Sequence, residues 1–180
     1  IYFGNRNWHP MVTDTIQQMK ADGIKRVLVF VTSAFSCYSG CRQYREDVIG
    51  ALEVLQLGKD DIQFDKIRVF YNHPDFIGTI ADKSREGIAK LPESDAPIHL
   101  VFTAHSIPNS MAVGSDYEVQ LAEASRLVAE EVGIPDWSLV YQSRSGPPQI
   151  PWLEPDVCDY IETLAKKGVK QIAIIDRKST

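Results

Sequence analysis

Short apolar runs that alternate with amphipathic stretches are the feature that most constrains how this chain can fold. Each run has about five residues, as a buried strand does, and the stretches between them carry apolar residues at helical spacing. The runs lie at residues 27–31, 67–71, 98–103, 138–142 and 172–175. Strands that are joined by helices need right-handed crossovers and therefore run parallel. We predict an α/β fold, a three-layer sandwich with a doubly wound, mainly parallel sheet.

The composition restricts the class of protein and its partners. The chain has 180 residues, 44% of them hydrophobic, and a formal net charge of −5 without a basic stripe. We therefore expect a globular protein with no nucleic-acid partner. No apolar run approaches the roughly 18 residues that a membrane-spanning helix needs. Three cysteines make no disulfide framework, so we expect a cytoplasmic protein, and we expect it to be a monomer.

Ligands of open parallel sheets bind outside the carboxyl ends of the strands. Four loops follow predicted strands, at residues 32–41, 72–75, 103–109 and 142–152. The last of these is rich in proline and glycine and carries Trp152, and a stiff loop of this kind can hold an aromatic wall against a flat ligand. Neither glycine-rich phosphate-binding motif follows any strand, so a nucleotide or flavin site has no support from motifs.

One histidine stands out among the four in the chain. His105, in the stretch "FTAHSIP", follows an apolar run and has small neighbours, which predicts an accessible side chain at the mouth of a strand. A neutral imidazole is both a base near pH 7 and a ligand for divalent metal ions. His99 lies inside a strand and is expected to be structural. His9 and His73 each precede a proline, which favours a role in a turn or a helix cap.

The cysteines leave their roles open. Cys37 and Cys41 have the spacing C-x-x-x-C, which is neither the C-x-x-C of thioredoxin-type proteins nor half of a recognisable zinc site. They are either two unrelated residues on a loop that enters a helix, or one of them is a nucleophile whose thiolate the helix terminus stabilises. Cys158 is expected to serve only in packing.

Several segments together resemble one family. "FTAHSIP" resembles the S-A-H-S-[LI]-P motif of ferrochelatases, and "YQSRSGPPQIPWLEPDV" resembles their Q-S-x-x-G-x-x-P-W-L-x-P segment. "YFGNRNWHP" and "SAFSCYSGCRQYRED" are similar to the actinobacterial branch. The resemblance implies a lyase of haem biosynthesis that inserts ferrous iron into a porphyrin, coproporphyrin III in this branch. It also implies two Rossmann-like domains with the porphyrin cleft between them.

The resemblance also implies roles for individual residues. His105 matches the family histidine, which either ligates Fe²⁺ or accepts a pyrrole proton, and both roles stay open. Tyr44 matches a porphyrin-contacting tyrosine, although a half-buried helix residue would look the same in the sequence. Trp152 is expected to contact the porphyrin. Cys41 matches the internal cysteine that joins three C-terminal cysteines around a [2Fe–2S] cluster.

The chain departs from the family pattern at both ends. The N-terminal loops that grip the porphyrin, the P-x-G-F-x-x-D-H-x-E segment with its glutamate, and the three C-terminal cysteines have no match, and the chain begins with Ile1 and ends in "DRKST". We therefore expect a fragment of a two-domain enzyme, inactive alone and without the cluster. The predicted domain spans 1–175, with 176–180 as a non-native tail. The alternative functions are a non-catalytic flavodoxin-like binding module and a haem or metal chaperone.

Overall fold

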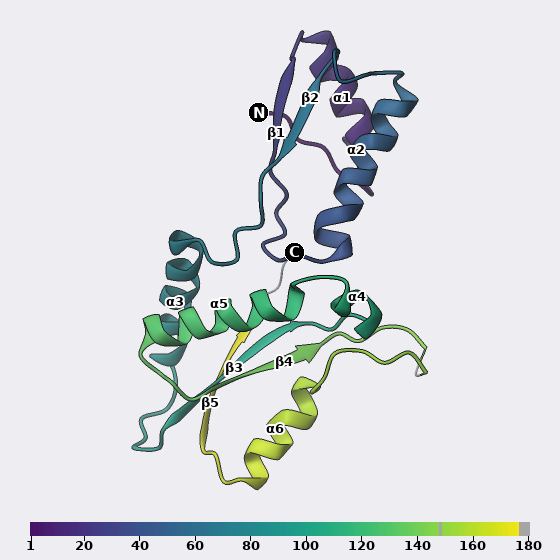
Figure 1. The fold of residues 1–180 in the computed structure, drawn as a ribbon. Coiled ribbons are helices and arrows are strands. Elements are labelled where there is room, and N and C mark those ends of the chain that lie inside the picture. The colour runs from purple at the N-terminus through teal and green to yellow at the C-terminus, as the bar shows by residue number, and fades with distance from the viewer. Residues whose placement is uncertain (148, 177–180) are drawn as a thin grey trace. The chain divides into compact units, whose positions relative to one another are not determined.

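The structure is a computed structural model that describes residues 1–147 and 149–176, and its chain forms two compact units (Figure 1). Unit 1 is Ile1–Val69 and unit 2 is Phe70–Thr180. The elements of unit 1 are α1 (Val12–Ala21), β1 (Arg26–Val29), the π-helical turn η1 (Tyr38–Arg42), α2 (Gln43–Val54) and β2 (Gln63–Lys66). Those of unit 2 are α3 (Pro74–Ile88), β3 (Ile98–His105), α4 (Asn109–Val113), α5 (Tyr117–Val132), β4 (Trp137–Gln142), α6 (Val157–Lys166) and β5 (Gln171–Asp176).

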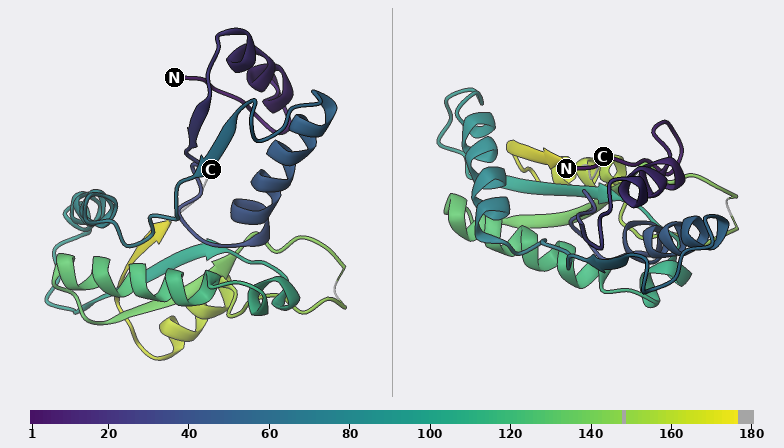
Figure 2. Two further views of the ribbon diagram at one scale, coloured as in Figure 1. Left: turned by 45° about the horizontal axis from the view of Figure 1, so that its top comes forward. Right: turned by 90° about the horizontal axis from the view of Figure 1, so that it is seen from above.

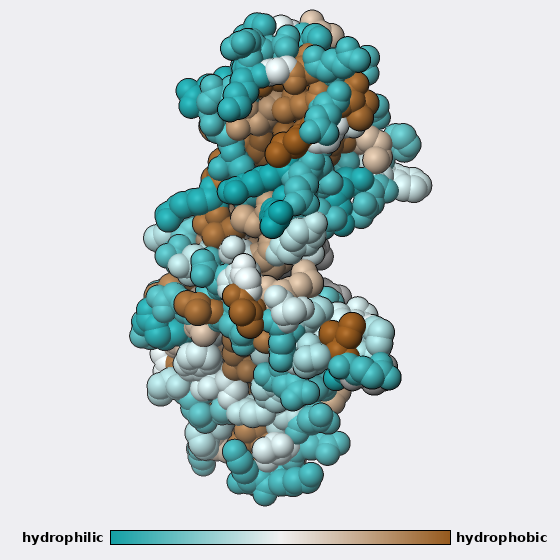
Figure 3. Space-filling view, turned by 45° about the vertical axis from the view of Figure 1, so that its right-hand side comes forward, coloured by the Kyte–Doolittle hydropathy of each residue, from teal (hydrophilic) through white to brown (hydrophobic). Residues whose placement is uncertain are grey.

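Unit 1 packs two helices on one side of a two-stranded parallel sheet (Figure 1). Its register pairs Arg26 with Gln63 and Val29 with Lys66. The buried core comes from both helices and from the segment before β2, and it consists of Ile16, Met19, Ala51, Leu57 and Ile62. Figure 3 shows apolar patches at the surface of this unit. Its exposed apolar side chains include Leu28, Phe30, Ile49 and Val54.

Unit 2 is a three-layer sandwich around the parallel sheet β4–β3–β5. The helices α3 and α5 cover one face and α6 covers the other (Figures 1 and 2). β3 is the central strand, and its residues Leu100, Val101 and Phe102 are fully buried. On the α6 face, Val101 and Val140 pack against Leu164. A buried central strand of this kind is a rigid base for whatever residue stands at its end.

The predicted α/β fold with parallel sheets is confirmed, and the strands divide between two open sheets. The strand predicted at 67–71 is wrong: β2 is Gln63–Lys66, and the apolar run lies between it and α3. Ile67 is 41% exposed, while the ring of Phe70 packs edge-to-face against Phe76 with 5.4 Å between centroids. The run is therefore a connection whose apolar residues serve local contacts, and periodicity alone could not separate this from a strand.

Three smaller outcomes concern the ends of elements and the membrane. The five-residue helix α4 was not predicted, because it is too short for a periodic pattern. The domain limits 1–175 stay a prediction: Asp176 ends β5 opposite Thr103, and 177–180 lie outside the described residues. Within 1–147 and 149–176, no helix has the length and apolar character to cross a membrane.

Candidate functional site

His105 is the last residue of the central strand of unit 2. Its side chain is exposed, whereas the residues on either side, Ala104 and Ser106, are buried. Among the described residues, neither nitrogen of its imidazole ring has a hydrogen-bond partner. The structure therefore confirms the prediction of an accessible histidine at the end of a strand. Both ring nitrogens are open to a proton or a metal ion.

Besides the pairing of β3 with β4, three hydrogen bonds hold the segment His105–Ser106 in place. The Tyr117 hydroxyl donates to the His105 carbonyl at 3.1 Å, and the Ser106 amide donates to the Gln142 carbonyl at 2.8 Å. The Ser106 hydroxyl donates to the Leu153 carbonyl at 2.8 Å in a buried position. The imidazole thus projects from a backbone that is tied to α5, to β4 and to the loop after β4.

The two loops that carry the most specific motifs lie side by side. The Leu153 amide donates to the Ile107 carbonyl and the Asn109 amide donates to the Pro151 carbonyl, both at 3.0 Å, with an antiparallel bridge between Pro108 and Trp152. These bonds join the segment after His105 to the segment that contains Trp152. The sequence separates the two motifs by about forty residues, and the fold brings them to one edge of the sheet.

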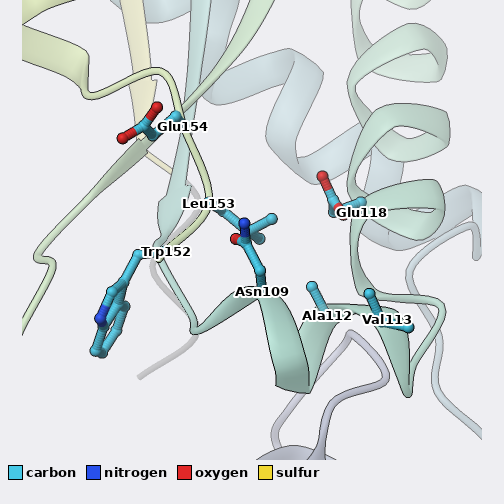
Figure 4. A pocket seen from close by; sticks show the side chains of 7 residues that line it. All are labelled: Asn109, Ala112, Val113, Glu118, Trp152, Leu153 and Glu154. Carbon is cyan, nitrogen blue, oxygen red and sulfur yellow. The ribbon is translucent and has the colours of Figure 1, made fainter. Parts of the chain in front are cut away.

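Trp152 is half-buried beside a small cavity at this edge (Figure 4). The cavity has a volume of about 340 Å³ and is lined by Asn109, Ala112, Val113, Glu118, Trp152, Leu153 and Glu154. In Figure 4 the indole points away from Asn109 and Glu118. Gly146 lies against the ring, since a Cβ there would meet Trp152 Cζ2 at 3.2 Å. The indole Nε1 is buried without a hydrogen-bond partner among the described residues.

A polar clasp crosses the carboxyl end of the sheet in unit 2. Asp176 Oδ1 accepts hydrogen bonds from Thr103 Oγ1 at 3.0 Å and from Gln142 Nε2 at 2.9 Å. The three residues belong to β5, β3 and β4, so the clasp joins all three strands. Thr103 precedes His105 by two residues and therefore points to the same face of the sheet. Sequence reasoning missed this group because it depends on the strand register.

Unit 1 contains the other two predicted site residues, Tyr44 and Cys41. Tyr44 is half-buried in the first turn of α2, with the Arg6 guanidinium 5.9 Å from its ring centroid. Arg6 Nε also lies 3.9 Å from Asp47 Oδ2. Tyr44 lines a groove of about 910 Å³ between α2 and the segment that leads into β2, together with Val29, Val48, Leu52, Leu57 and Phe64 among others.

The turn before α2 has its own electrostatic pattern. The Tyr38 hydroxyl donates to Glu46 at 2.8 Å, and Arg42 Nε donates to the same carboxylate at 2.8 Å. The hydrogen bond to Glu46 raises the pKa of Tyr38, and the bonds from Tyr38 and Arg42 lower the pKa of Glu46. Both groups are exposed, so solvent screens these interactions and they act on the turn alone.

Two other histidines have the structural roles that were predicted. His99 is buried, with Nδ1 at 2.9 Å from Asp136 and Nε2 at 2.9 Å from the Ser138 hydroxyl. His73 precedes α3 and its Nδ1 accepts from the amide of Asp75 at 3.3 Å, which is a helix cap. Both side chains therefore make structural contacts, unlike that of His105.

Comparison with known proteins agrees with these motifs. The ferrochelatase family model matches residues 1–176. The chain belongs to the ferrochelatase family. It is 55% identical over 169 residues to a ferrochelatase of Rhodopirellula baltica. It is 47% identical over 182 residues to a coproporphyrin III ferrochelatase of Corynebacterium glutamicum, and 49% identical over 178 residues to one of Mycolicibacterium vanbaalenii.

These ferrochelatase relatives are about twice as long as the chain. The matches cover 93% to 97% of the chain and 48% to 52% of the relatives. The predicted membership of the family, with relatives in actinobacteria, is therefore confirmed. The activity, the substrates and the partners belong to whole proteins of which this chain spans about half.

The cysteines do not by themselves suit a cluster. An iron–sulfur cluster of the [2Fe–2S] type needs four thiolate ligands in its usual form. This ferrochelatase chain has three cysteines, with Cys37 and Cys41 in unit 1 and Cys158 in unit 2. Across the described ranges, no group of three or more His, Cys, Asp or Glu side chains is arranged to hold a metal ion. A cluster at Cys41 would need ligands from outside this chain.

The local structure of the cysteines also corrects one prediction. Cys37 Sγ accepts from the Gly40 amide at 3.2 Å, and Cys41 donates its amide to the Cys37 carbonyl at 2.9 Å, so both belong to the turn that begins α2. A Cβ at Gly40 would lie 2.3 Å from Ser33 Oγ and 3.1 Å from the Phe35 carbonyl oxygen, so a larger residue there would displace the Ser33 side chain. The prediction that Cys158 serves in packing is wrong, since its side chain is exposed at the start of α6.

Proposed function

We propose that this chain is part of a ferrochelatase that inserts Fe²⁺ into coproporphyrin III, and that His105 is its catalytic histidine. The observation that carries the proposal is the environment of His105. It stands at the carboxyl end of a buried strand with an exposed ring and open ring nitrogens, within a motif of the family. The choice of coproporphyrin III rests on the names of relatives such as the Corynebacterium glutamicum protein.

The reaction defines what His105 has to do. When Fe²⁺ enters a porphyrin, two pyrrole N–H bonds break, both electron pairs stay on nitrogen to bind the iron, and two protons leave. A neutral imidazole can accept one of these protons on a ring nitrogen and become imidazolium, or it can bind Fe²⁺ before transfer. Both roles need an open ring nitrogen at a fixed position, and a histidine at the end of β3 supplies it.

The remaining predicted contacts are part of the same proposal. Tyr44 would contact the porphyrin through its ring, next to the Arg6 guanidinium, and a cation beside the ring suits a porphyrin that carries carboxylates. Trp152 would contact the macrocycle from the loop that is tied to the His105 segment. The free cysteines suit a reducing compartment, and we propose that the protein works in the cytoplasm.

A hybrid protein tests the function directly. The residues of the Corynebacterium glutamicum relative that match this chain would be replaced by this chain, and iron insertion into coproporphyrin III would be followed anaerobically by the absorption of the metalloporphyrin. We expect the hybrid to be active and His105→Ala to lower turnover by about 10²–10⁴-fold. His73→Ala, which removes a histidine from the cap of α3, is the matched control and should stay active.

Two results would contradict the proposal. One is near-normal turnover of the His105→Ala hybrid, and the other is a hybrid that folds and binds porphyrin but inserts no iron. The chain by itself is a separate arm of the test. It spans about half of its relatives, so we expect no iron insertion above background from it.

We also propose that Cys41 is a ligand of a [2Fe–2S] cluster in the whole protein, on the strength of the motif "SCYSGCRQYRED". The other ligands would be cysteines outside this chain. The chain purified under anaerobic conditions with iron and sulfide should therefore remain colourless, while the whole protein shows a visible iron–sulfur absorption band that Cys41→Ala removes. A band from the chain alone would mean that Cys37 and Cys158 act as ligands, contrary to the proposal.

A further inference from the structure

The peptide group that follows His105 is held on both sides. In a parallel sheet, alternate residues of a central strand turn their amide and carbonyl groups toward alternate neighbours. Leu100 and Ser106 turn their amides to the β4 side, where they donate to the carbonyls of Asp136, just before β4, and of Gln142 at its end. The odd-numbered residues of β3, His105 included, therefore face β5. The described part of β5 ends at Asp176, opposite Thr103, which is two residues before His105.

A side chain donates a hydrogen bond to the His105 carbonyl. The Tyr117 hydroxyl donates to the His105 carbonyl at 3.1 Å. Tyr117 is the first residue of α5 and is 5% exposed. The helix behind it is fixed to the sheet by Leu121, Ala124 and Val128, all of which are buried. The donor is therefore placed by a rigid element.

The carbonyl of His105 and the amide of Ser106 belong to one planar peptide group. Tyr117 holds the carbonyl, and the Gln142 carbonyl holds the amide at 2.8 Å. The C=O and N–H of this peptide group point in opposite directions within its plane. Because both are bonded, the plane cannot rotate, and the backbone angle ψ of His105 is fixed. The backbone at His105 sets the direction of its Cα–Cβ bond, so this fixed peptide group fixes the point from which the imidazole projects.

We propose that Tyr117 is a positioning residue for His105. Its phenol fixes the peptide group from which the imidazole projects, and it touches no reacting atom. The proposal rests on the proposed function for its catalytic consequence, but the positioning itself can be measured without activity. The signal in the sequence is weak: a tyrosine at the start of a helix, twelve residues after the histidine, does not reveal where its hydroxyl points.

The first test is NMR on the chain itself. Tyr117→Phe removes only the hydroxyl, and the imidazole signals of His105, assigned by their loss in His105→Gln, should shift and broaden. The Ser106 amide should exchange with solvent about tenfold faster. The control is Tyr160→Phe, which removes a phenol that is hydrogen-bonded to Ser138 at 2.5 Å in the same unit, and which should leave both readouts unchanged. Unchanged His105 signals in Tyr117→Phe would overturn the proposal.

A measurement on the unaltered chain covers the case in which Tyr117→Phe does not fold. The hydroxyl proton of Tyr117 should then be visible as a slowly exchanging signal close to the Ser106 amide. A hydroxyl that exchanges at the solvent rate would overturn the proposal as well. Both readouts are independent of turnover, so a failure of the proposed function does not decide them.

The hybrid protein gives the kinetic consequence. Because misplacement of a catalytic group slows the bound reaction more than it weakens binding, Tyr117→Phe should lower kcat about tenfold and leave KM for the porphyrin within about twofold. Tyr160→Phe should change neither. If His105→Ala has no effect on the hybrid, the proposed function fails. If His105→Ala abolishes turnover and Tyr117→Phe leaves kcat unchanged, only the positioning role fails.

Discussion

Ser106→Ala is the perturbation whose effect can be worked out most closely from the structure. The Ser106 side chain is 2% exposed, and its hydroxyl donates to the Leu153 carbonyl at 2.8 Å. No other described residue is seen to donate to that carbonyl. The bond joins the residue after His105 to the loop that carries Trp152. Removing the hydroxyl leaves a buried carbonyl without a donor.

The same chain contains a matched substitution with the opposite expectation. The Ser125 hydroxyl is also buried and also donates to a carbonyl at 2.8 Å, that of Leu121 one helical turn earlier. The helix already gives the Leu121 carbonyl an amide donor, so Ser125→Ala leaves nothing unpaired. An unpaired buried acceptor costs about 1–3 kcal/mol. Ser106→Ala should therefore lower the free energy of unfolding of unit 2 by that amount, and Ser125→Ala should change it by less than about 0.5 kcal/mol.

Tryptophan fluorescence can follow unit 2 alone. The chain has three tryptophans, and only Trp8 lies in unit 1, so a Trp8→Phe background leaves the emission of Trp137 and Trp152. Urea unfolding of the two serine variants in this background gives the two free energies under identical conditions. If Ser106→Ala loses no more stability than Ser125→Ala, the bond to Leu153 does not hold the two loops together and the reasoning fails.

Two more predictions concern other parts of the chain. Gly146 has φ = +126° and lies against Trp152, so Gly146→Ala should destabilise unit 2 by about 1–3 kcal/mol in urea unfolding, whereas Gly78→Ala inside α3 should stabilise it by about 0.5–1 kcal/mol. The bonds from Tyr38 and Arg42 lower the pKa of Glu46 below that of an ordinary glutamate. They therefore stabilise the fold fully above the ordinary pKa, and this stabilisation is lost as the pH falls through the lowered pKa. Glu46→Gln should destabilise unit 1 at neutral pH and not in acid; an equal loss at both would contradict this.

The sequence predicted best those helices and strands that are marked by the spacing of apolar residues close together in the chain. In α1, the apolar residues Val12, Ile16 and Met19 stand at helical spacing, and Ile16 and Met19 are buried in the core of unit 1. β3 was predicted from the run at 98–103, in which four of the six residues are apolar, and such a run is typical of a buried strand. Such signals depend only on neighbours in the chain, so tertiary structure did not change them.

The parts that were missed depend on residues that are distant in the sequence. The run at 67–71 has the composition of a strand, but the residues that pair with β1 are Gln63–Lys66. Which residues pair depends on contacts between β1 and β2, and the composition of the run does not show them. In the site, the His105 motif predicted the histidine itself, while the contacts that hold it come from Tyr117, Gln142 and Leu153. Those contacts follow from the order of the strands and the entry angle of α5, which a single sequence does not reveal.

The two histidines of β3 show why position within the strand decides the chemistry. His99 and His105 are six residues apart, so both point to the same face of the sheet. At His99, Asp136 occupies one ring nitrogen and Ser138 the other, and burial at 6% exposure keeps solvent away. A ring in that state can neither receive a proton from a substrate nor bind a metal ion without breaking the network. At His105 the strand has ended and the side chain is exposed, so only the main chain is committed to neighbours. A fixed backbone under an open imidazole suits the proton acceptance or iron binding that we propose for His105, and among the described residues of β3 the carboxyl end is where it occurs.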